Sequence, residues 1–191
     1  MRVISGQFKG RKLFSINNEK VRPTLGRAKE SIFDILSSIL KKKNKNYFDL
    51  TVVDGFCGTG ALGIEALSRG AREVLFIDNS RSSMDLVKKN CRFLKVEKKV
   101  YFYLCDILKI KKLNYSPNLF FLDPPYNFKD YDLLFKIFRQ NKIFSEGAIV
   151  VLETSKRILF VEPVEFKLIR KQKISNSLFF FLEYSGSSTV E

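Results

Sequence analysis

The segment from Leu50 to Gly63 constrains the fold more than any other part of the chain. An apolar run at 50–53 passes through a glycine-rich loop into a pattern that predicts a helix from about Ala61 to Arg69. Glycine lets the backbone approach a ligand closely and adopt dihedral angles that other residues disfavour. A buried strand that turns through glycines into a helix is typical of the first unit of an α/β sheet that binds a ligand at that turn.

The same alternation of short apolar runs and helical patterns continues along the chain. Further runs that predict buried strands lie at 73–77, 100–104, 118–122 and 148–152, and helical patterns lie at 81–94, 107–112 and 131–140. Strands that alternate with helices predict a parallel sheet with helices on both faces. Two strand-like segments at 165–172 and 177–184 meet at a polar turn, which predicts an antiparallel hairpin at one edge of the sheet.

A shorter and more basic region precedes this α/β core. Residues 1–22 alternate apolar and polar side chains, with Gly6 and Gly10 as turn points, which suits a short hairpin or an extended arm. Pro23 then opens an amphipathic helical pattern that ends in the basic run at 41–45. We therefore divide the chain into a basic N-terminal arm and helix, residues 1–45, and an α/β domain, residues 46–191.

The charge of the chain is concentrated in that N-terminal region. The sequence has 34 Lys and Arg against 20 Asp and Glu, a net charge of +14, and residues 1–50 alone carry +8. A concentrated basic segment indicates a polyanionic partner, most often nucleic acid. A Lys-rich coding bias is the alternative that the composition leaves open.

Histidine and cysteine usage excludes several classes of chemistry. The chain has no His, and its three Cys form no CxxC pair. This excludes Ser-His-Asp catalysis, His-ligated metals and most structural zinc sites, and it suits a reducing compartment. No signal core and no uncharged apolar stretch of membrane-spanning length is present, so we expect a cytoplasmic protein.

The glycine loop has two interpretations. Gly58-x-Gly60-x-x-Gly63 matches the dinucleotide fingerprint, with Asp78 after the next strand, so an NAD(P)-dependent oxidoreductase stays open. However, Asp54 precedes the loop, where a carboxylate repels a pyrophosphate but suits a cationic amino acid. S-adenosyl-L-methionine carries an ammonium and a sulfonium and no phosphate. The pattern Asp54-x-Phe56-x-Gly58-x-Gly60 therefore predicts a site for its methionine end, with Asp78 on its ribose.

The tetrapeptide Asp123-Pro124-Pro125-Tyr126 follows the apolar run at 118–122. The prolines restrict the backbone to an extended bend at the edge where open α/β sheets bind ligands. The Asp123 carboxylate and the Pro124 carbonyl can accept the two hydrogens of a planar amino group. Tyr126 can stack on the base, which is worth about 1–3 kcal/mol. These four residues are the predicted catalytic set, and adenine, cytosine and guanine amines all suit it.

Held in this way, an exocyclic amine becomes a better nucleophile. Two acceptors on its hydrogens favour a pyramidal nitrogen whose lone pair points at the methyl donor, so catalysis rests on alignment and electrostatics. Asp123 or water can take the proton that the methylated nitrogen releases. The chemistry requires no metal.

These motifs, with Arg2-x-Ile4-x-Gly6, Arg22-Pro23-Thr24 and the stretch from Asp54 to Ala71, resemble the RsmD-type methyltransferases over nearly the whole chain. The resemblance implies a Rossmann-like class I methyltransferase fold with a seven-stranded, mostly parallel sheet. It implies methylation of guanine N2 in 16S rRNA and places Asp106 near the adenine of the cofactor. The sequence departs from the family at Gly55, where an apolar residue is expected, and at Asp78, where Glu is more familiar.

The implied partner is 16S rRNA in the small ribosomal subunit or an assembly intermediate, bound by a monomer. Candidate RNA-binding residues are Lys9, Arg11 and Lys12 in the arm, and Arg22 and Arg27 near the helix start, where a guanidinium can bind phosphate bidentately. The two arginines can equally cap the sheet or pair with a carboxylate. The open alternatives are an amino-methyltransferase for adenine N6 or cytosine N4 of another RNA or DNA, and a non-catalytic RNA-binding module.

Overall fold

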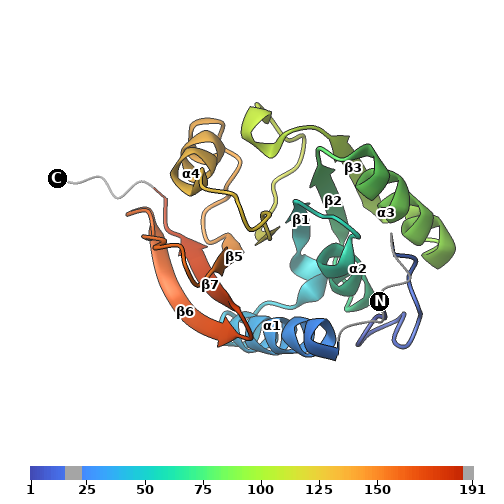
Figure 1. Cartoon of the computed structure of the whole chain (residues 1–191). Helices are drawn as coiled ribbons and strands as arrows, with labels where there is room; N and C mark the ends of the chain where they lie inside the picture. The colour runs from blue at the N-terminus through green and yellow to red at the C-terminus, as the bar shows by residue number, and fades with distance from the viewer. Residues whose placement is uncertain (16–22, 187–191) are drawn as a thin grey trace.

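A seven-stranded sheet with helices on both faces forms the centre of the computed structural model, which describes residues 1–15 and 23–186 (Figure 1). The strand order is β3-β2-β1-β4-β5-β7-β6. The strands are β1 (Thr51–Gly55), β2 (Glu73–Asp78), β3 (Val100–Leu104), β4 (Leu119–Leu122), β5 (Ile149–Ser155), β6 (Phe166–Ile174) and β7 (Ser177–Tyr184). β1 to β5 run parallel and β7 runs antiparallel to both its neighbours. The predicted α/β fold with a terminal antiparallel hairpin is confirmed.

In residues 1–15 and 23–186, four α-helices and three 3-10 turns precede or connect the strands. They are α1 (Pro23–Lys42), α2 (Ala61–Ser68), α3 (Arg81–Leu94), α4 (Tyr131–Gln140), η1 (Tyr47–Asp49), η2 (Glu97–Lys99) and η3 (Ile107–Lys109). The helix predicted at 107–112 is only the single turn η3, because the backbone is already extended at Ile110, whose side chain is buried in the core. Within the described residues, no helix has the length and apolarity needed to cross a bilayer.

The core has two layers, one on each face of the sheet. Successive strand residues alternate between them, so Val52 packs with α1, α2 and α3, whereas Val53 packs with α4 and η3. Because β1 is covered on both faces, all five of its residues are buried, including the carboxylate of Asp54.

The N-terminal arm is a hairpin that packs on the helices. Arg2 pairs with Lys12 in an antiparallel bridge, and Val3 and Leu13 are buried in the same core layer as α1. Gly6 has φ +81°, and a Cβ there would lie 1.8 Å from the carbonyl oxygen of Ser68. Only glycine fits where the hairpin rests on the end of α2. The domain boundary at residue 45 stays a prediction.

A buried carboxylate, Glu65 in α2, ties three parts of the chain together. Its side chain is fully buried and forms ion pairs with Lys29 of α1 at 2.9 Å and Arg69 at 3.1 Å. It also accepts hydrogen bonds from the backbone N–H groups of Ile4 and Ser5, each at 2.9 Å. Two cations and two donors compensate the buried charge, so the hairpin and α1 are held against α2.

Candidate active site

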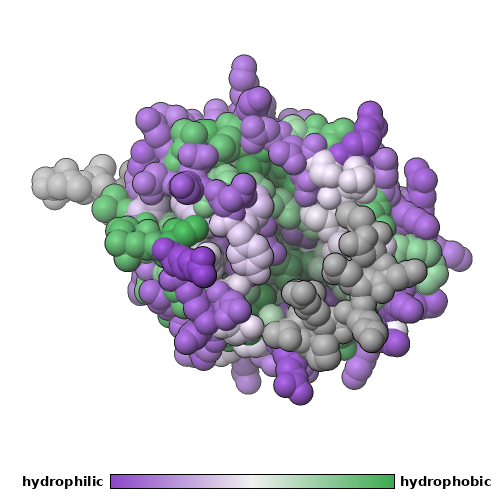
Figure 2. Space-filling model, viewed as in Figure 1, coloured by the Kyte–Doolittle hydropathy of each residue, from purple (hydrophilic) through white to green (hydrophobic). Residues whose placement is uncertain are grey.

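The carboxyl ends of β1, β2, β4 and β5 meet at one edge of the sheet. The register aligns Gly55 with Ile77 and Leu122, and Leu122 with Leu152. The next residues along these strands are Asp78, Asp123 and Glu153, which therefore lie at one level of the edge. The face drawn in Figure 2 is hollowed near its centre, where Figure 1 shows β1 and α2.

Two carboxylates hold the glycine loop in place. The N–H of Gly58 donates to Asp78 Oδ2 at 2.8 Å, and the N–H of Gly63 donates to Asp54 Oδ2 at 2.8 Å. Gly58 and Gly60 have φ of +52° and +73°, which favour glycine. A Cβ at Gly58 would meet nothing closer than the Phe56 carbonyl oxygen at 3.9 Å. The loop therefore presents an open backbone surface beside the partly exposed Asp78 carboxylate.

Asp54 lies beneath this loop rather than on its open side. It is only 3% exposed. Burial raises the pKa of its carboxyl to about 8, the hydrogen bond from Gly63 opposes this, and repulsion from Asp78 adds to it. The geometry makes Asp54 a support for the loop, and its contact with the methionine end of a cofactor stays a prediction.

Packing explains why two positions near the loop are glycine. A Cβ at Gly55 would lie 2.7 Å from Ile107 Cδ1 and 2.9 Å from Leu122 Cδ2. A Cβ at Gly63 would lie 2.5 Å from the Phe76 ring. The apolar side chain that the family resemblance leads one to expect at position 55 is thus replaced here by Ile107 and Leu122, which fill the space.

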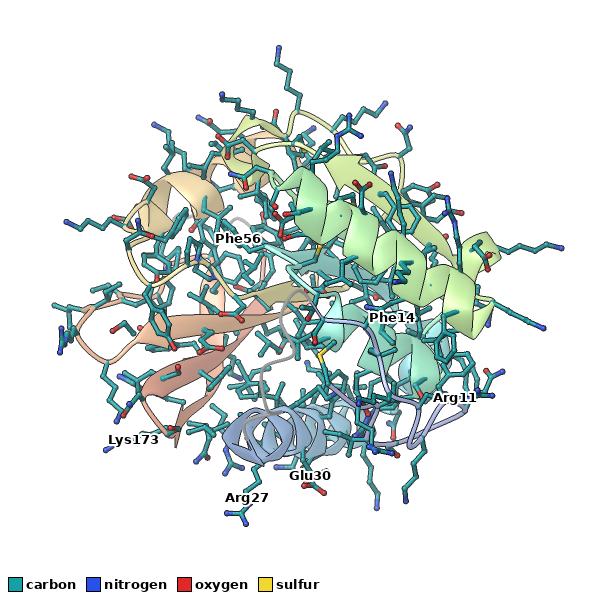
Figure 3. The ribbon with its side chains drawn as sticks, turned by 45° about the vertical axis from the view of Figure 1, so that its right-hand side comes forward. Arg11, Phe14, Arg27, Glu30, Phe56 and Lys173 are labelled. Atoms are coloured by element: carbon teal, nitrogen blue, oxygen red, sulfur yellow. The ribbon has the colours of Figure 1, made fainter. Side chains whose placement is uncertain are left out.

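Phe56 links the glycine loop to the predicted catalytic segment. Its backbone has φ +58°, which costs a non-glycine residue about 1–2 kcal/mol. Its ring packs edge-on against Phe128 with 5.2 Å between centroids, and Phe128 packs on Tyr131 at 5.1 Å. Figure 3 shows Phe56 between α3 and α4. The contact places the two predicted motifs next to each other, although they are about seventy residues apart in sequence.

The tetrapeptide forms an open turn directly after β4. Asp123 is accessible to solvent, Pro124 is buried, and the N–H of Phe128 donates to the Pro125 carbonyl at 2.8 Å to close the turn. The Tyr126 side chain is 79% exposed, which is unusual for a large aromatic ring. An exposed ring beside an accessible carboxylate is the arrangement that stacking on a planar base requires.

Glu153, two residues before the end of β5, is a candidate site residue that the sequence did not predict. It lies beside Asp123 in the parallel register. Asp123 is open to solvent on one side. Its other sides are buried by the protein, and this burial is the main reason that its pKa is raised well above the usual range. Repulsion and a hydrogen bond from Glu153 come next, and repulsion from Asp54 is smaller. The signal was present, because the apolar run at 148–152 ends in an acid as the run at 118–122 does.

Asp106 follows β3 and caps η3. Its Oδ1 accepts a hydrogen bond from the N–H of Leu108 at 3.0 Å, and its side chain is 40% exposed. The adjacent Cys105 donates its N–H to the Asp78 carbonyl at 3.0 Å, so Asp106 lies close to the ribose-binding candidate. Its contact with an adenine stays a prediction. Among the residues that the structure describes, no cluster of His, Cys, Asp and Glu is arranged to hold a metal ion.

The predicted RNA-binding residues do not form one cluster in the described structure. Lys9, Arg11, Lys12 and Arg27 are all exposed, and Arg22 lies outside the described residues. Arg11 lies 5.9 Å from the centroid of the Phe93 ring on α3. In Figure 3, Arg27 projects outward from α1, away from Phe56. Their contact with RNA stays a prediction.

The strand order, the glycine loop after β1 and the acid at the end of β2 together define the Rossmann-like class I methyltransferase fold. A structure titled "Putative methyltransferase yhhF from Escherichia coli" superposes with a TM-score of 0.82 at 24% identity, covering 98% of this chain and 99% of that one. A sequence model of the family described as "Conserved hypothetical protein 95" matches residues 1–183. The chain belongs to this family, which confirms the resemblance to the RsmD-type methyltransferases.

Curated relatives cover most of the chain. One is "Ribosomal RNA small subunit methyltransferase D" of Haemophilus influenzae, 30% identical over 176 residues, which are 90% of this chain and 88% of the relative. The protein of the same name from Escherichia coli K12 is 28% identical over 154 residues, 81% of this chain and 74% of the relative. The fold by itself does not decide activity, since the [4+2]-cyclase SpnF also superposes, with a TM-score of 0.60 at 9% identity.

Proposed function

We propose that this protein transfers a methyl group from S-adenosyl-L-methionine to the N2 amino group of a guanine in small-subunit rRNA. One observation carries the proposal: the open turn with Asp123 and Tyr126 lies at the same sheet edge as the glycine loop, joined to it by Phe56 and Phe128. The names of the relatives support rRNA of the small subunit as the substrate class. The choice of guanine N2 rests on the family resemblance.

The residues at the loop fit this cofactor. The open side of Gly58 admits a ligand against the backbone, and the Asp78 carboxylate beside it can accept from ribose hydroxyls. Acidic residues at this edge favour a cationic ligand over a pyrophosphate. When bound there, S-adenosyl-L-methionine supplies the methyl group from its sulfonium. In this scheme Gly58, Gly60 and Phe56 shape the loop, Asp54 fixes it, and Asp106 contacts the adenine.

The tetrapeptide then positions and deprotonates the amine. The Asp123 carboxylate and the Pro124 carbonyl accept its two hydrogens, while Tyr126 stacks on the base. As the new N–C bond would form, the S–CH3 bond of the cofactor would break and S-adenosyl-L-homocysteine would leave. The nitrogen would then be acidic, its N–H bond would break, and the proton would pass to Asp123. A carboxylate whose pKa is raised by burial and by Glu153 holds that proton better than an ordinary one.

The N-terminal hairpin is proposed to contact the RNA backbone. Lys9, Arg11 and Lys12 are exposed on it, and Arg27 is exposed on α1, so each can reach a phosphate without desolvation of a buried charge. The proposed substrate is the small subunit or an assembly intermediate, and the proposed enzyme is a monomer.

The test is methyl transfer to small ribosomal subunits that lack base methylation. The protein is incubated with methyl-labelled S-adenosyl-L-methionine, and the digested RNA is analysed by mass spectrometry. N2-methylguanosine is the expected product. Methyladenosine or methylcytidine would keep the mechanism and refute the guanine specificity. Absence of both transfer and cofactor binding would refute the methyltransferase and favour the NAD(P)-dependent alternative.

A further inference from the structure

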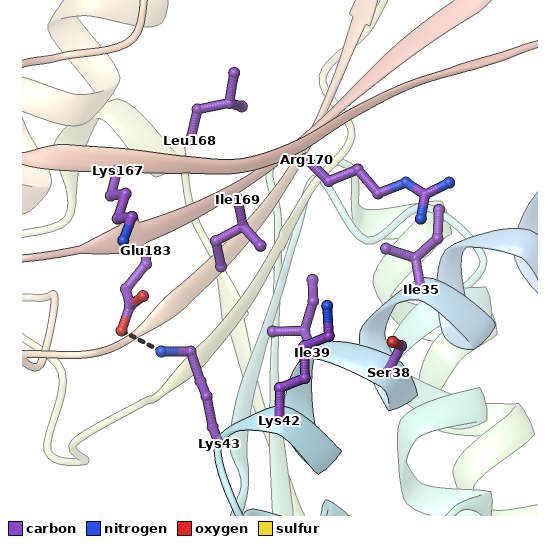
Figure 4. A pocket seen from close by; sticks show the side chains of 10 residues that line it. All are labelled: Ile35, Ser38, Ile39, Lys42, Lys43, Lys167, Leu168, Ile169, Arg170 and Glu183. Carbon is purple, nitrogen blue, oxygen red and sulfur yellow. Dashed lines mark hydrogen bonds and ion pairs between the residues drawn. The ribbon is translucent and has the colours of Figure 1, made fainter.

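A groove lies between the C-terminal half of α1 and the edge strand β6, apart from the predicted RNA-binding residues (Figure 4). It encloses about 500 Å³. Isoleucines form its apolar floor, and basic side chains line its walls. The lining residues used below are Ile35, Ile39, Lys42, Lys43, Lys167, Ile169, Arg170 and Glu183.

A β-bulge builds the strand side of this groove. Lys167 is paired with Glu183 and Arg170 with Phe181, with a shift in register between Leu168 and Arg170. Glu183 and Phe181 are two residues apart on β7 and so share a face, which puts Lys167 and Arg170 on one face as well. In a regular strand, residues three apart point to opposite faces. The bulge therefore turns a second cation toward α1, as bulges commonly re-aim side chains.

Like charges face one another across the groove. Lys42 and Lys43 of α1 lie opposite Lys167 and Arg170 of β6 (Figure 4). Glu183, the acid in the lining, is ion-paired with Lys43. Within the part of the chain that the structure describes, Lys42, Lys167 and Arg170 have no carboxylate partner. Lys42, Lys167 and Arg170 line the same groove, and its acid Glu183 is already paired with Lys43, so an anion bound in the groove would reduce the repulsion among these positive charges.

Lysines on edge strands also have a general role, since they discourage pairing with another sheet. That role accounts for Lys171 and Lys173, which lie on the other face of β6, opposite Phe180 and Leu178. Protection of an edge strand requires neither a β-bulge in β6 nor the two lysines, Lys42 and Lys43, on the facing helix α1. Arg170 is moreover held in place, because its Nη2 donates to Gln172 Oε1 at 2.9 Å. The α1 side of β6 is thus arranged differently from an ordinary charged edge.

We propose that this α1–β6 groove binds successive phosphates of one strand of the substrate RNA, an inference that rests on the proposed function. β6 ends at the hairpin turn, where Ser177 pairs with Ser155 at the carboxyl end of β5. A strand that leaves the target base at this edge can follow β6 into the groove. There Arg170, Lys167 and Lys42 bind phosphates, and the apolar floor of Ile39 and Ile169 contacts riboses.

The experiment compares two double variants of β6 with the same change in charge. Lys167→Gln with Arg170→Gln removes the groove cations, and Lys171→Gln with Lys173→Gln removes two cations from the opposite face. Binding of in vitro transcribed 16S rRNA is measured by filter binding at several salt concentrations. The groove variant is expected to bind about 10-fold or more weakly at ~0.15 M salt, with the slope of log K against log salt reduced by about 2. The control is expected to lose less than half as much.

Thermal unfolding and cofactor calorimetry check that both variants are folded and bind S-adenosyl-L-methionine as the parent is expected to. Equal losses in the two variants would overturn the proposal in favour of unspecific attraction. Unchanged RNA affinity in the groove variant would overturn it as well and would leave an acidic protein surface as the occupant. If the parent binds RNA through the groove but transfers no methyl group, the proposed function fails while the groove assignment stands.

Discussion

Two acidic sites in this protein, one around Glu65 and one around Asp123, are constructed in opposite ways. Glu65 is fully buried and is neutralised by Lys29 and Arg69 as well as by two backbone donors. Asp123 is open to solvent, and its charged neighbours are the further acids Glu153 and Asp54. One charge is compensated within the fold, whereas the other has no counter-ion among the residues that the structure describes.

The difference separates a structural charge from a ligand-binding charge. A buried carboxylate with complete partners joins elements, and losing it exposes its cations to an apolar interior. Acids that repel one another at an open edge destabilise the ionised fold and are relieved when a cationic ligand or a proton arrives. The α1–β6 groove is the same arrangement with the opposite sign.

The largest expected effect is on Asp123. Asp123→Ala should lower methyl transfer by about 10³-fold, because the amine loses both its hydrogen-bond acceptor and its proton acceptor. The affinity for S-adenosyl-L-methionine should stay within about tenfold, or ~1.4 kcal/mol. Single-turnover transfer and calorimetry measure the two quantities. Asp132→Ala, at an exposed position of α4, is the control. Weak cofactor binding together with normal turnover at saturation would contradict the assigned role.

The complementary prediction concerns Glu65. Glu65→Gln should lower the free energy of unfolding by about 3 kcal/mol, because the Lys29 and Arg69 charges lose their partner inside the protein. Urea denaturation measures the change, and Glu146→Gln at an exposed position is the control. Surface substitutions usually change the free energy of unfolding by less than about 0.5 kcal/mol. A change of that size for Glu65→Gln would show that Glu65 does not stabilise the fold in the way that distinguishes it from Asp123.

Asp78 should show a smaller effect confined to the cofactor. Asp78→Ala should weaken S-adenosyl-L-methionine binding by about 1.5–3 kcal/mol, the value of hydrogen bonds to a charged group, with little change in turnover at saturation. Equilibrium binding and saturating kinetics separate these effects, and the exposed Asp85→Ala is the control. If the substitution changed turnover alone, Asp78 would act in the chemical step and not in cofactor binding.

The smallest expected effect sharpens the role of Glu153. Burial and Glu153 raise the pKa of Asp123, and a protonated Asp123 cannot take up the proton that the methylated amine releases, so activity should fall as the pH decreases through that raised pKa. Glu153→Gln removes one repulsion while Asp54 remains, so the pKa of Asp123 should fall. The acidic limb of the kcat profile should then move to lower pH. Burial and both acids raise the pKa of the Tyr131 hydroxyl above its ordinary value, so its titration does not produce an acidic limb. An unmoved limb would assign the titration to another group.

The sequence alone determined the order of the elements and the positions of both motifs. Strands of a parallel sheet that is covered on both faces are mostly apolar, so each appears as a short run, and the residues at its carboxyl end can be identified from the sequence. This located Asp78 and Asp123 at the correct edge and the glycine loop between β1 and α2. The resemblance to a family added the expected class of fold.

Only the tertiary structure decided which residues are neighbours. The register between β4 and β5 puts Glu153 beside Asp123 thirty residues away, and packing by Ile107 explains glycine at position 55. The bulge before Arg170 is a shift in pairing between β6 and β7, which no local pattern of side chains records. Local propensity and hydrophobic period act within one element, whereas register, bulges and charge compensation arise between elements and therefore require the folded chain.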